Sequence, residues 1–388
     1  MTALDAAALA DLDTHLRSAA SADTFSGVVR IERDGDPLFE RAYGVASRRW
    51  GAPVRTSTRF DVASVTKLFT AVAVLQQVGE GRLGLEDRIH DHVDLVGTTI
   101  PREVTIRHLL THTSGIADDA DEEAGESYEA LWVDRPSYSV TRTADFLPGF
   151  VHKEPNFPPG EGCRYCNVGF VLAGLALEKV TGTTYREYVR EHVFARAGMD
   201  RSGFFRMDEA EPDVAEGWEP VRDGSDDGPV TGWRQNIYSY PPVGSPDGGA
   251  HVTARDLARF WAAVRGGELL PPDLTRTFLT PQVEHDDGDT GETDEKDAPE
   301  AERAAGVHYG FGLEFELLAD GSVRSAYKDG INTGASAILR HYPDPGTSTD
   351  GDDALPPAGA PGVTVVVVSN GESGAWGPVR RIDDLVRG

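Results

Sequence analysis

Apolar residues follow two kinds of period along the chain, and each predicts a different element. The segment DVASVTKLFTAVAVLQQVG (61–79) is apolar on most faces of a helix, which predicts a buried central helix. Runs rich in β-forming residues on both sides of Asp34-Gly35-Asp36 predict an early hairpin within residues 25–46. Four more runs predict strands near the C-terminus: GFGLEFELL, SVRSAYKD, GASAILRHY and GVTVVVVSN.

The middle of the chain has mainly helical periods. Residues 117–160 are the exception, because they are rich in Asp, Glu and Pro and are expected to form an irregular excursion beside a site. The first twenty residues and the closing WGPVRRIDDLVRG each predict a helix. Short helices are also predicted from VTIRHLLTH, NVGFVLAGLALEKVTG, TTYREYVREHVFARAGM and TARDLARFWAAVRGG.

These elements predict an α+β fold. Strands from both ends of the chain form one antiparallel β-sheet, flanked by the N- and C-terminal helices, with an inserted, mostly helical subdomain. The expected boundaries are 1–85 and 307–388 for the sheet subdomain and 86–283 for the helical one. Residues 284–306 contain ten acids and two bases, which predicts an acidic solvated loop.

The chain is strongly acidic. Sixty-four Asp and Glu against 37 Lys and Arg give a net charge of −27, and only five of the basic residues are lysines. Phosphate backbones and anionic membrane surfaces repel such a chain, so neither nucleic acid nor membrane is an expected partner. Because the acids are spread along the whole chain, adaptation to molar salt is favoured over the alternative of an ordinary acidic protein.

No run of about 18 apolar residues is present, so no membrane-spanning helix is expected. The N-terminal stretch has aspartates inside its apolar part and no basic region before it. It therefore predicts an amphipathic helix instead of a signal peptide, and the expected location is the cytoplasm.

Cysteine and histidine spacings raise two weaker hypotheses. Cys163 and Cys166 form a C-x-x-C pair, for which two semi-buried loop residues are the favoured interpretation, with a local disulfide or a redox role as alternatives. His108 and His112 have a zinc-compatible i, i+4 spacing, but no glutamate follows His108 and no third ligand is evident. No metal and no cofactor are predicted.

Ser64 and Lys67 are the first candidates for chemistry. On a helix, positions i and i+3 share a face, so the hydroxyl and the amine can meet, and a lysine with a lowered pKa can accept the proton. Ser64 is also expected near the helix N-terminus, where free N–H groups favour developing negative charge. The second S-x-x-K match, Ser325 to Lys328, lies in a predicted strand, where these positions face opposite sides.

Two more motifs follow in order: Tyr165-Cys166-Asn167 before a predicted helix, and Lys328-Asp329-Gly330 near a strand end. Together with S-x-x-K they form the signature of serine β-lactamases and penicillin-binding proteins. The chain resembles the class C β-lactamase-like family, which includes D,D-peptidases, D-aminopeptidases and family VIII esterases. The resemblance covers most of the chain and includes HLLTHTSG, FPPGEGCRYCNVGFVLAGLALEKVTG, FARAGM and PDGGAHVTARDLARF.

The resemblance implies the β-lactamase/transpeptidase-like fold and a role for each motif residue. Ser64 would be the acylated nucleophile, Lys67 its proton-shuttling partner and Tyr165 the general base. A tyrosine can act as a base near neutral pH only if cations stabilise its phenolate, and Lys67 and Lys328 would supply two.

The substrate-binding residues implied by the resemblance are Asn167, Lys328 and Gly330. Asn167 would hydrogen-bond a substrate amide, and the backbone N–H groups of Ser64 and Ile331 would form the oxyanion hole. The Lys328 ammonium is also expected to bind a carboxylate on the substrate, unless it serves only Tyr165.

Two positions depart from the family pattern. Cys166 stands where most relatives have serine, and Ile331 is bulkier than the glycine common after this motif. The expected function is that of a serine hydrolase acting through an acyl-enzyme on a small molecule or short peptide, with lactam, ester and amide bonds all open. The alternative is a catalytically silent binding protein on the same scaffold.

Overall fold

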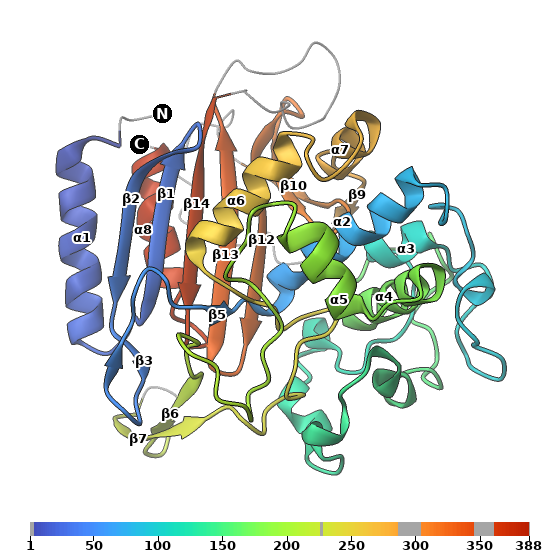
Figure 1. Cartoon of the computed structure of the whole chain (residues 1–388), viewed down its shortest axis with the longest axis horizontal. Coiled ribbons are helices and arrows are strands. Elements are labelled where there is room, and N and C mark those ends of the chain that lie inside the picture. The colour runs from blue at the N-terminus through green and yellow to red at the C-terminus, as the bar shows by residue number, and fades with distance from the viewer. Residues whose placement is uncertain (1–3, 226–227, 286–303, 345–360, 388) are drawn as a thin grey trace.

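A computed structural model describes residues 4–225, 228–285, 304–344 and 361–387, and it has one eight-stranded sheet (Figure 1). Neighbouring strands pair antiparallel in the order β2-β1-β14-β13-β12-β11-β10-β9. The two ends of the chain therefore meet in one sheet, as the strand patterns predict. The strands are β1 (Gly27–Arg33), β2 (Asp36–Tyr43), β9 (Val283–His285), β10 (Ala304–Tyr309), β11 (Glu314–Leu318), β12 (Val323–Asn332), β13 (Ala335–Pro343) and β14 (Gly362–Ser369).

The two terminal helices cover one face of this sheet. Helix α1 (Ala6–Ser21) begins at its N-cap Asp5, and helix α8 (Trp376–Arg387) ends the described chain. Their apolar residues pack in one core with alternate residues of β14, Val363, Val365 and Val367. The intervening Val366 and Val368 belong to the core on the opposite face, which is the period of two expected of a strand buried on both sides.

Helix α2 (Thr66–Gly79) runs through the core on that opposite face. Twelve of its 14 residues are buried, which agrees with the apolar pattern in the sequence. The helix begins later than residue 61, because Phe60 and Asp61 form the short strand β5 and pair with β8 (His251–Val252). A 3₁₀ turn, Ala63–Val65, joins that strand to the helix.

The remaining helices surround α2 or lie on the sheet. Helix α6 (Ala254–Arg265) contacts β1 and β14, and in Figure 1 it lies in front of the sheet. Helix α5 (Tyr185–Val189) continues into a π-helical turn, Arg190–Phe194. The other helices are α3 (Ile106–Leu110), α4 (Asn167–Thr181) and α7 (Pro272–Phe278).

Two parts of the structure differ from the sequence pattern. The predicted solvated loop 284–306 overlaps β9 and β10 at its two ends, while residues 286–303 lie outside the described residues. The middle of the chain also contains a short hairpin, β6 (Trp218–Arg222) and β7 (Val230–Gln235), where helices and loops were expected. Within residues 117–160 the only regular elements among the described residues are four 3₁₀ segments.

None of the helices in the described ranges is both long enough and apolar enough to cross a bilayer.

Candidate active site

Ser64 lies in the turn that leads into the buried helix α2. Asp61 Oδ1 accepts a hydrogen bond from the Ala63 N–H at 2.7 Å, which fixes this turn. Ala63 has φ of +43°, a left-handed conformation that is costly for a residue other than glycine and is often found at functional sites. The turn places Ser64 just before the helix, where the positive end of the helix dipole favours negative charge on its hydroxyl.

Lys67 is fully buried and connects Ser64 to the second motif. Its Nζ lies 3.0 Å from Ser64 Oγ and 2.7 Å from Asn167 Oδ1. It also donates to the Asp247 carbonyl at 2.7 Å, so three oxygens accept from one ammonium group. The i, i+3 spacing thus brings the hydroxyl and the amine into contact, as the sequence predicts.

Asn167 begins helix α4 and is held there by Asp118. The Asp118 carboxylate accepts the backbone N–H of Asn167 at 2.7 Å and that of Val168 at 3.0 Å, which caps the helix. Burial raises the pKa of Asp118 to about 6, although these two N–H groups act in the opposite direction. Because Asn167 is fixed at both its backbone and its amide oxygen, its Nδ2 has a defined direction, toward Glu122 Oε1 at 3.2 Å.

Tyr165 lies between the two motif lysines. Both Lys67 Nζ and Lys328 Nζ are 5.0 Å from the centre of its ring. The ring stacks on His112 at 4.5 Å, and His112 Nδ1 accepts the N–H of Cys166 at 3.0 Å. Within the described chain the Tyr165 hydroxyl makes no hydrogen bond, so the structure places the ring but does not join the hydroxyl to Ser64.

His112 supports Tyr165 as an uncharged ring. Burial, and then the charges of Lys67 and Lys328, lower the pKa of His112 well below its usual range. Its backbone is left-handed, with φ of +58°. Because the lone pair of His112 Nδ1 already accepts the Cys166 N–H, that atom cannot also bind zinc. No cluster of three metal-ligating side chains occurs among the described residues.

Lys328 is buried beside Glu314. Its Nζ lies 2.5 Å from Glu314 Oε1 and 3.5 Å from Asp329 Oδ1. Burial disfavours the ammonium, but the negative charges of Glu314 and Asp329, and that of Tyr165 as a phenolate, hold the pKa of Lys328 well above its usual range. The Lys328 charge is therefore balanced by a buried carboxylate in the substrate-free protein.

Gly330 allows strand β12 to run against the nucleophile turn. A Cβ on Gly330 would lie 2.4 Å from the Val62 carbonyl oxygen and 2.7 Å from Ser64 N, closer than such atoms approach. Only glycine permits this contact. The backbone of Gly330 and Ile331 therefore borders the Ser64 amide. Ile331 is 49% exposed and lines the same cavity as Ser64 and Asn167.

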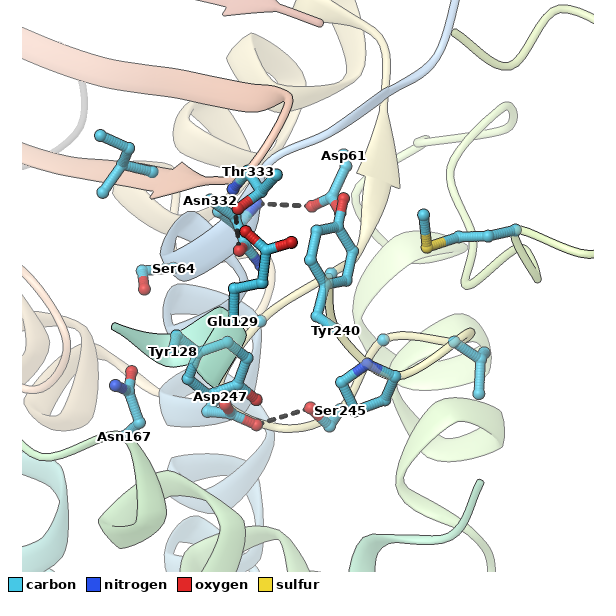
Figure 2. A pocket seen from close by; sticks show the side chains of 18 of the residues that line it. Asp61, Ser64, Tyr128, Glu129, Asn167, Tyr240, Ser245, Asp247, Asn332 and Thr333 are labelled. Carbon is cyan, nitrogen blue, oxygen red and sulfur yellow. Dashed lines mark hydrogen bonds between the residues drawn. The ribbon is translucent and has the colours of Figure 1, made fainter. Parts of the chain in front are cut away.

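Ser64 and Asn167 open into a cavity of about 350 Å³ (Figure 2). Figure 2 shows Ser64 and Asn167 on one side of it and Tyr240 and Ser245 on the other. Its described lining contains no lysine or arginine. It contains six acidic residues: Asp61, Glu122, Glu126, Glu129, Asp247 and Glu372.

Both cysteines are free thiols. The Cys166 thiol is buried and faces the Ile116 carbonyl at 3.6 Å, and the half-buried Cys163 thiol faces the Thr111 carbonyl at 3.9 Å. Burial raises the pKa of Cys163 to about 12, which makes it a poor nucleophile.

The second S-x-x-K match, Ser325 to Lys328, does not bring its serine and lysine together. Ser325 donates a hydrogen bond to Glu316, while Lys328 binds Glu314.

Comparison with known proteins places this site in a family. The family model "Beta-lactamase" matches residues 12–385, which is nearly the whole chain. The chain belongs to the β-lactamase family. This membership confirms the resemblance carried by the three motifs.

The relatives and solved structures agree with the family and the fold. A penicillin-binding protein from Bacillus halodurans superposes with a TM-score of 0.79 at 35% identity, over 96% of this chain and 99% of that one. Esterase EstB of Burkholderia gladioli is 32% identical over 70% of this chain and 74% of its own length. The predicted α+β fold of the β-lactamase/transpeptidase type is therefore confirmed.

Some relatives of the family are much longer than the region that matches. Penicillin-binding protein 4* of Bacillus subtilis is 32% identical over 46% of this chain, but the match spans only 38% of its length. Penicillin-binding protein 4 of Amycolatopsis lactamdurans is 30% identical over 63% of this chain and 60% of its own.

Four residues of the site were not predicted from sequence as parts of it: Asp118, Glu122, Asp247 and Glu314. Asp118, Glu122 and Asp247 reach motif residues from distant parts of the chain, as Asp247 does across 180 positions to Lys67. Glu314 reaches Lys328 from 14 positions away, on the neighbouring strand β11. The signal that could have found two of them is the irregular excursion 117–160, which was expected beside a site and contains both Asp118 and Glu122.

Proposed function

We propose that this protein is a serine hydrolase that acts through an acyl-enzyme formed on Ser64. The observation that carries the proposal is Lys67 Nζ, placed 3.0 Å from Ser64 Oγ and bound at the same time to Asn167 Oδ1, because Ser64 and Asn167 both line a substrate-sized cavity. Relatives named as an esterase and as a D-aminopeptidase keep both ester and amide substrates open, beside lactams.

The proposed reaction has two halves. Ser64 Oγ attacks the carbonyl carbon while its proton passes to the deprotonated member of the pair, the Tyr165 phenolate or a neutral Lys67 amine, and the oxyanion is held by the N–H groups of Ser64 and Ile331. When the tetrahedral intermediate collapses, the leaving group takes that proton and an ester to Ser64 remains. Water then attacks the ester carbonyl with the same base, which releases the acid and restores the hydroxyl.

Covalent labelling tests this proposal. The protein is treated with a fluorophosphonate and, separately, with a penicillin, and the adduct is located by intact mass and peptide mapping. We expect one adduct per chain, on Ser64, and none on the Ser64→Ala variant. Adducts on Ser325 or Ser114 would contradict the mechanism, and no adduct under any condition with an intact fold would favour a silent binding protein.

A narrower proposal concerns a carboxylate on the substrate, which the sequence predicts to bind Lys328. The Lys328 ammonium is already paired with Glu314 at 2.5 Å, which favours its other role beside Tyr165. We therefore expect Lys328→Ala to lower kcat/KM equally for a carboxylated substrate and its methyl ester. An additional loss of about 1.5 to 3 kcal/mol on the carboxylated substrate would show instead that Lys328 binds the carboxylate.

We also propose adaptation to salt, on the strength of the −27 charge. The Debye length falls from about 10 Å at 0.1 M to about 3 Å at 1 M, so repulsion among the acids is screened. Thermal unfolding should show a Tm that rises by about 5 °C or more between 0.1 and 2 M KCl. A parallel titration with sucrose controls for general exclusion effects. A flat or falling Tm in KCl would contradict this proposal and leave the hydrolase proposal intact.

A further inference from the structure

The acidic wall of the active-site cavity has few cationic partners within the protein. Of its six acidic residues only Glu129 forms an ion pair with a basic side chain in the described chain, with Arg234 at 2.5 Å. Asp247 accepts from the Ser245 hydroxyl at 2.6 Å, and Glu126 from a backbone N–H at 2.9 Å. These two carboxylates accept hydrogen bonds from neutral groups of the protein, but no basic side chain of the described chain forms an ion pair with them. A substrate that enters the cavity can therefore still form hydrogen bonds and ion pairs with them.

Glu122 is the carboxylate most directly connected to the nucleophile. Its Oε1 accepts from Asn167 Nδ2 at 3.2 Å, and Asn167 Oδ1 in turn accepts from the Lys67 ammonium that contacts Ser64. Three hydrogen bonds thus separate the Glu122 carboxylate from the Ser64 hydroxyl, all along one wall of the cavity. The Glu122 side chain is exposed and can meet a substrate without a rearrangement of the core.

The cavity lining also contains a ring nitrogen that is unpaired within the described chain. His251 lines the cavity, is 6% exposed, and its Nδ1 has no hydrogen-bond partner in the part of the chain that is described. Burial lowers the pKa of His251, which keeps the ring uncharged. The cavity is therefore rich in carboxylate acceptors, and its described lining has no lysine or arginine, so the surface is complementary to a ligand that brings its own donors and positive charge.

We propose that Glu122 is a specificity residue that binds a primary ammonium group on the acyl part of the substrate, so that the protein prefers amino-acyl amides or esters over their N-acylated forms. The proposal rests on the hydrolase function proposed above. The ammonium would donate to Glu122 beside the Asn167 amide and replace water at an exposed carboxylate. Because Asn167 has a second N–H, it can hold Glu122 and still donate to a substrate carbonyl.

The test uses two substrates that differ only in charge: an amino-acyl p-nitroanilide and its N-acetyl derivative. The variants are Glu122→Gln, which keeps an acceptor for Asn167, and Glu161→Gln, an exposed residue outside the cavity lining that controls for the loss of one negative charge. Steady-state kcat/KM is measured for both substrates, and fluorophosphonate labelling of Ser64 is followed in parallel.

We expect the wild-type protein to prefer the free amine, and Glu122→Gln to lower kcat/KM for it by about 10- to 100-fold, mostly through KM. The N-acetyl substrate should change by less than about threefold, and Glu161→Gln should leave both unchanged. Equal losses on the two substrates in Glu122→Gln, or a wild-type preference for the N-acetyl form, would overturn the inference. Ser64 labelling separates the two failures, because its absence overturns the hydrolase proposal itself.

Discussion

Replacing Ser64 with alanine should lower kcat by about 10⁴-fold or more on any substrate that the wild-type protein hydrolyses, since the change removes the atom proposed to carry the acyl group. The fold should persist. Lys67 keeps its bonds to Asn167 Oδ1 and the Asp247 carbonyl, so its buried ammonium remains satisfied after the hydroxyl is lost.

The measurement is single-turnover and steady-state hydrolysis, with the Tm of both proteins recorded beside it. Ser322→Ala is a suitable control, because Ser322 lies in an exposed turn where its hydroxyl donates only to Asp320. Turnover of the Ser64→Ala variant within tenfold of the wild type, with an unchanged Tm, would show that another nucleophile carries the reaction.

The elements with strong local periods were predictable, and those fixed by distant partners were not. The helix following Ser64 and the strands β12, β13 and β14 each have an apolar pattern long enough to identify them. The start of α2 was placed too early because Asp61 pairs with His251, 190 positions away, and no local pattern records that pairing. Strand β9 has only three residues and borders an acid-rich segment, so it has no alternating pattern long enough to predict a strand.

The same distinction applies to the site. The contact between Ser64 and Lys67 follows from helical spacing alone, and the order of three motifs indicated the other residues. The partner of Lys328 was not accessible in this way. Glu314 reaches Lys328 because β11 pairs with β12 in a register that places Glu314 opposite Tyr327, and a register is set by the whole sheet.

The ion pair between Lys328 and Glu314 changes the interpretation of the site. In sequence, Lys328 is one of five lysines and is expected to bind a substrate carboxylate unless it serves only Tyr165. In the structure its charge is balanced by Glu314, while the accessible side of the cavity is acidic. The acidic wall thus supports the proposal of a cationic substrate group near Glu122, and the pairing of Lys328 with Glu314 supports its proposed role beside Tyr165.

Removing only the Tyr165 hydroxyl distinguishes the two candidate bases. Tyr165→Phe should lower kcat by about 10² to 10⁴-fold if the phenol transfers the proton, the usual range for a general base. The fold should not change, because the phenylalanine ring keeps the stacking on His112 at 4.5 Å and the contacts of both lysines with its face. Tyr309→Phe is the matched control, since Tyr309 lies in the same aromatic cluster, 6.3 Å from Tyr165.

The structure makes this experiment decisive because the two bases differ in geometry. Lys67 Nζ already contacts Ser64 Oγ at 3.0 Å, whereas the Tyr165 hydroxyl makes no hydrogen bond in the described part of the chain and must approach in the substrate complex. If Tyr165 is the base, kcat of the variant falls while its Tm stays at the wild-type value, and Tyr309→Phe keeps the wild-type kcat and Tm. A kcat within about threefold of the wild type would assign the base to Lys67, with Tyr165 as a ring that positions the two ammonium groups.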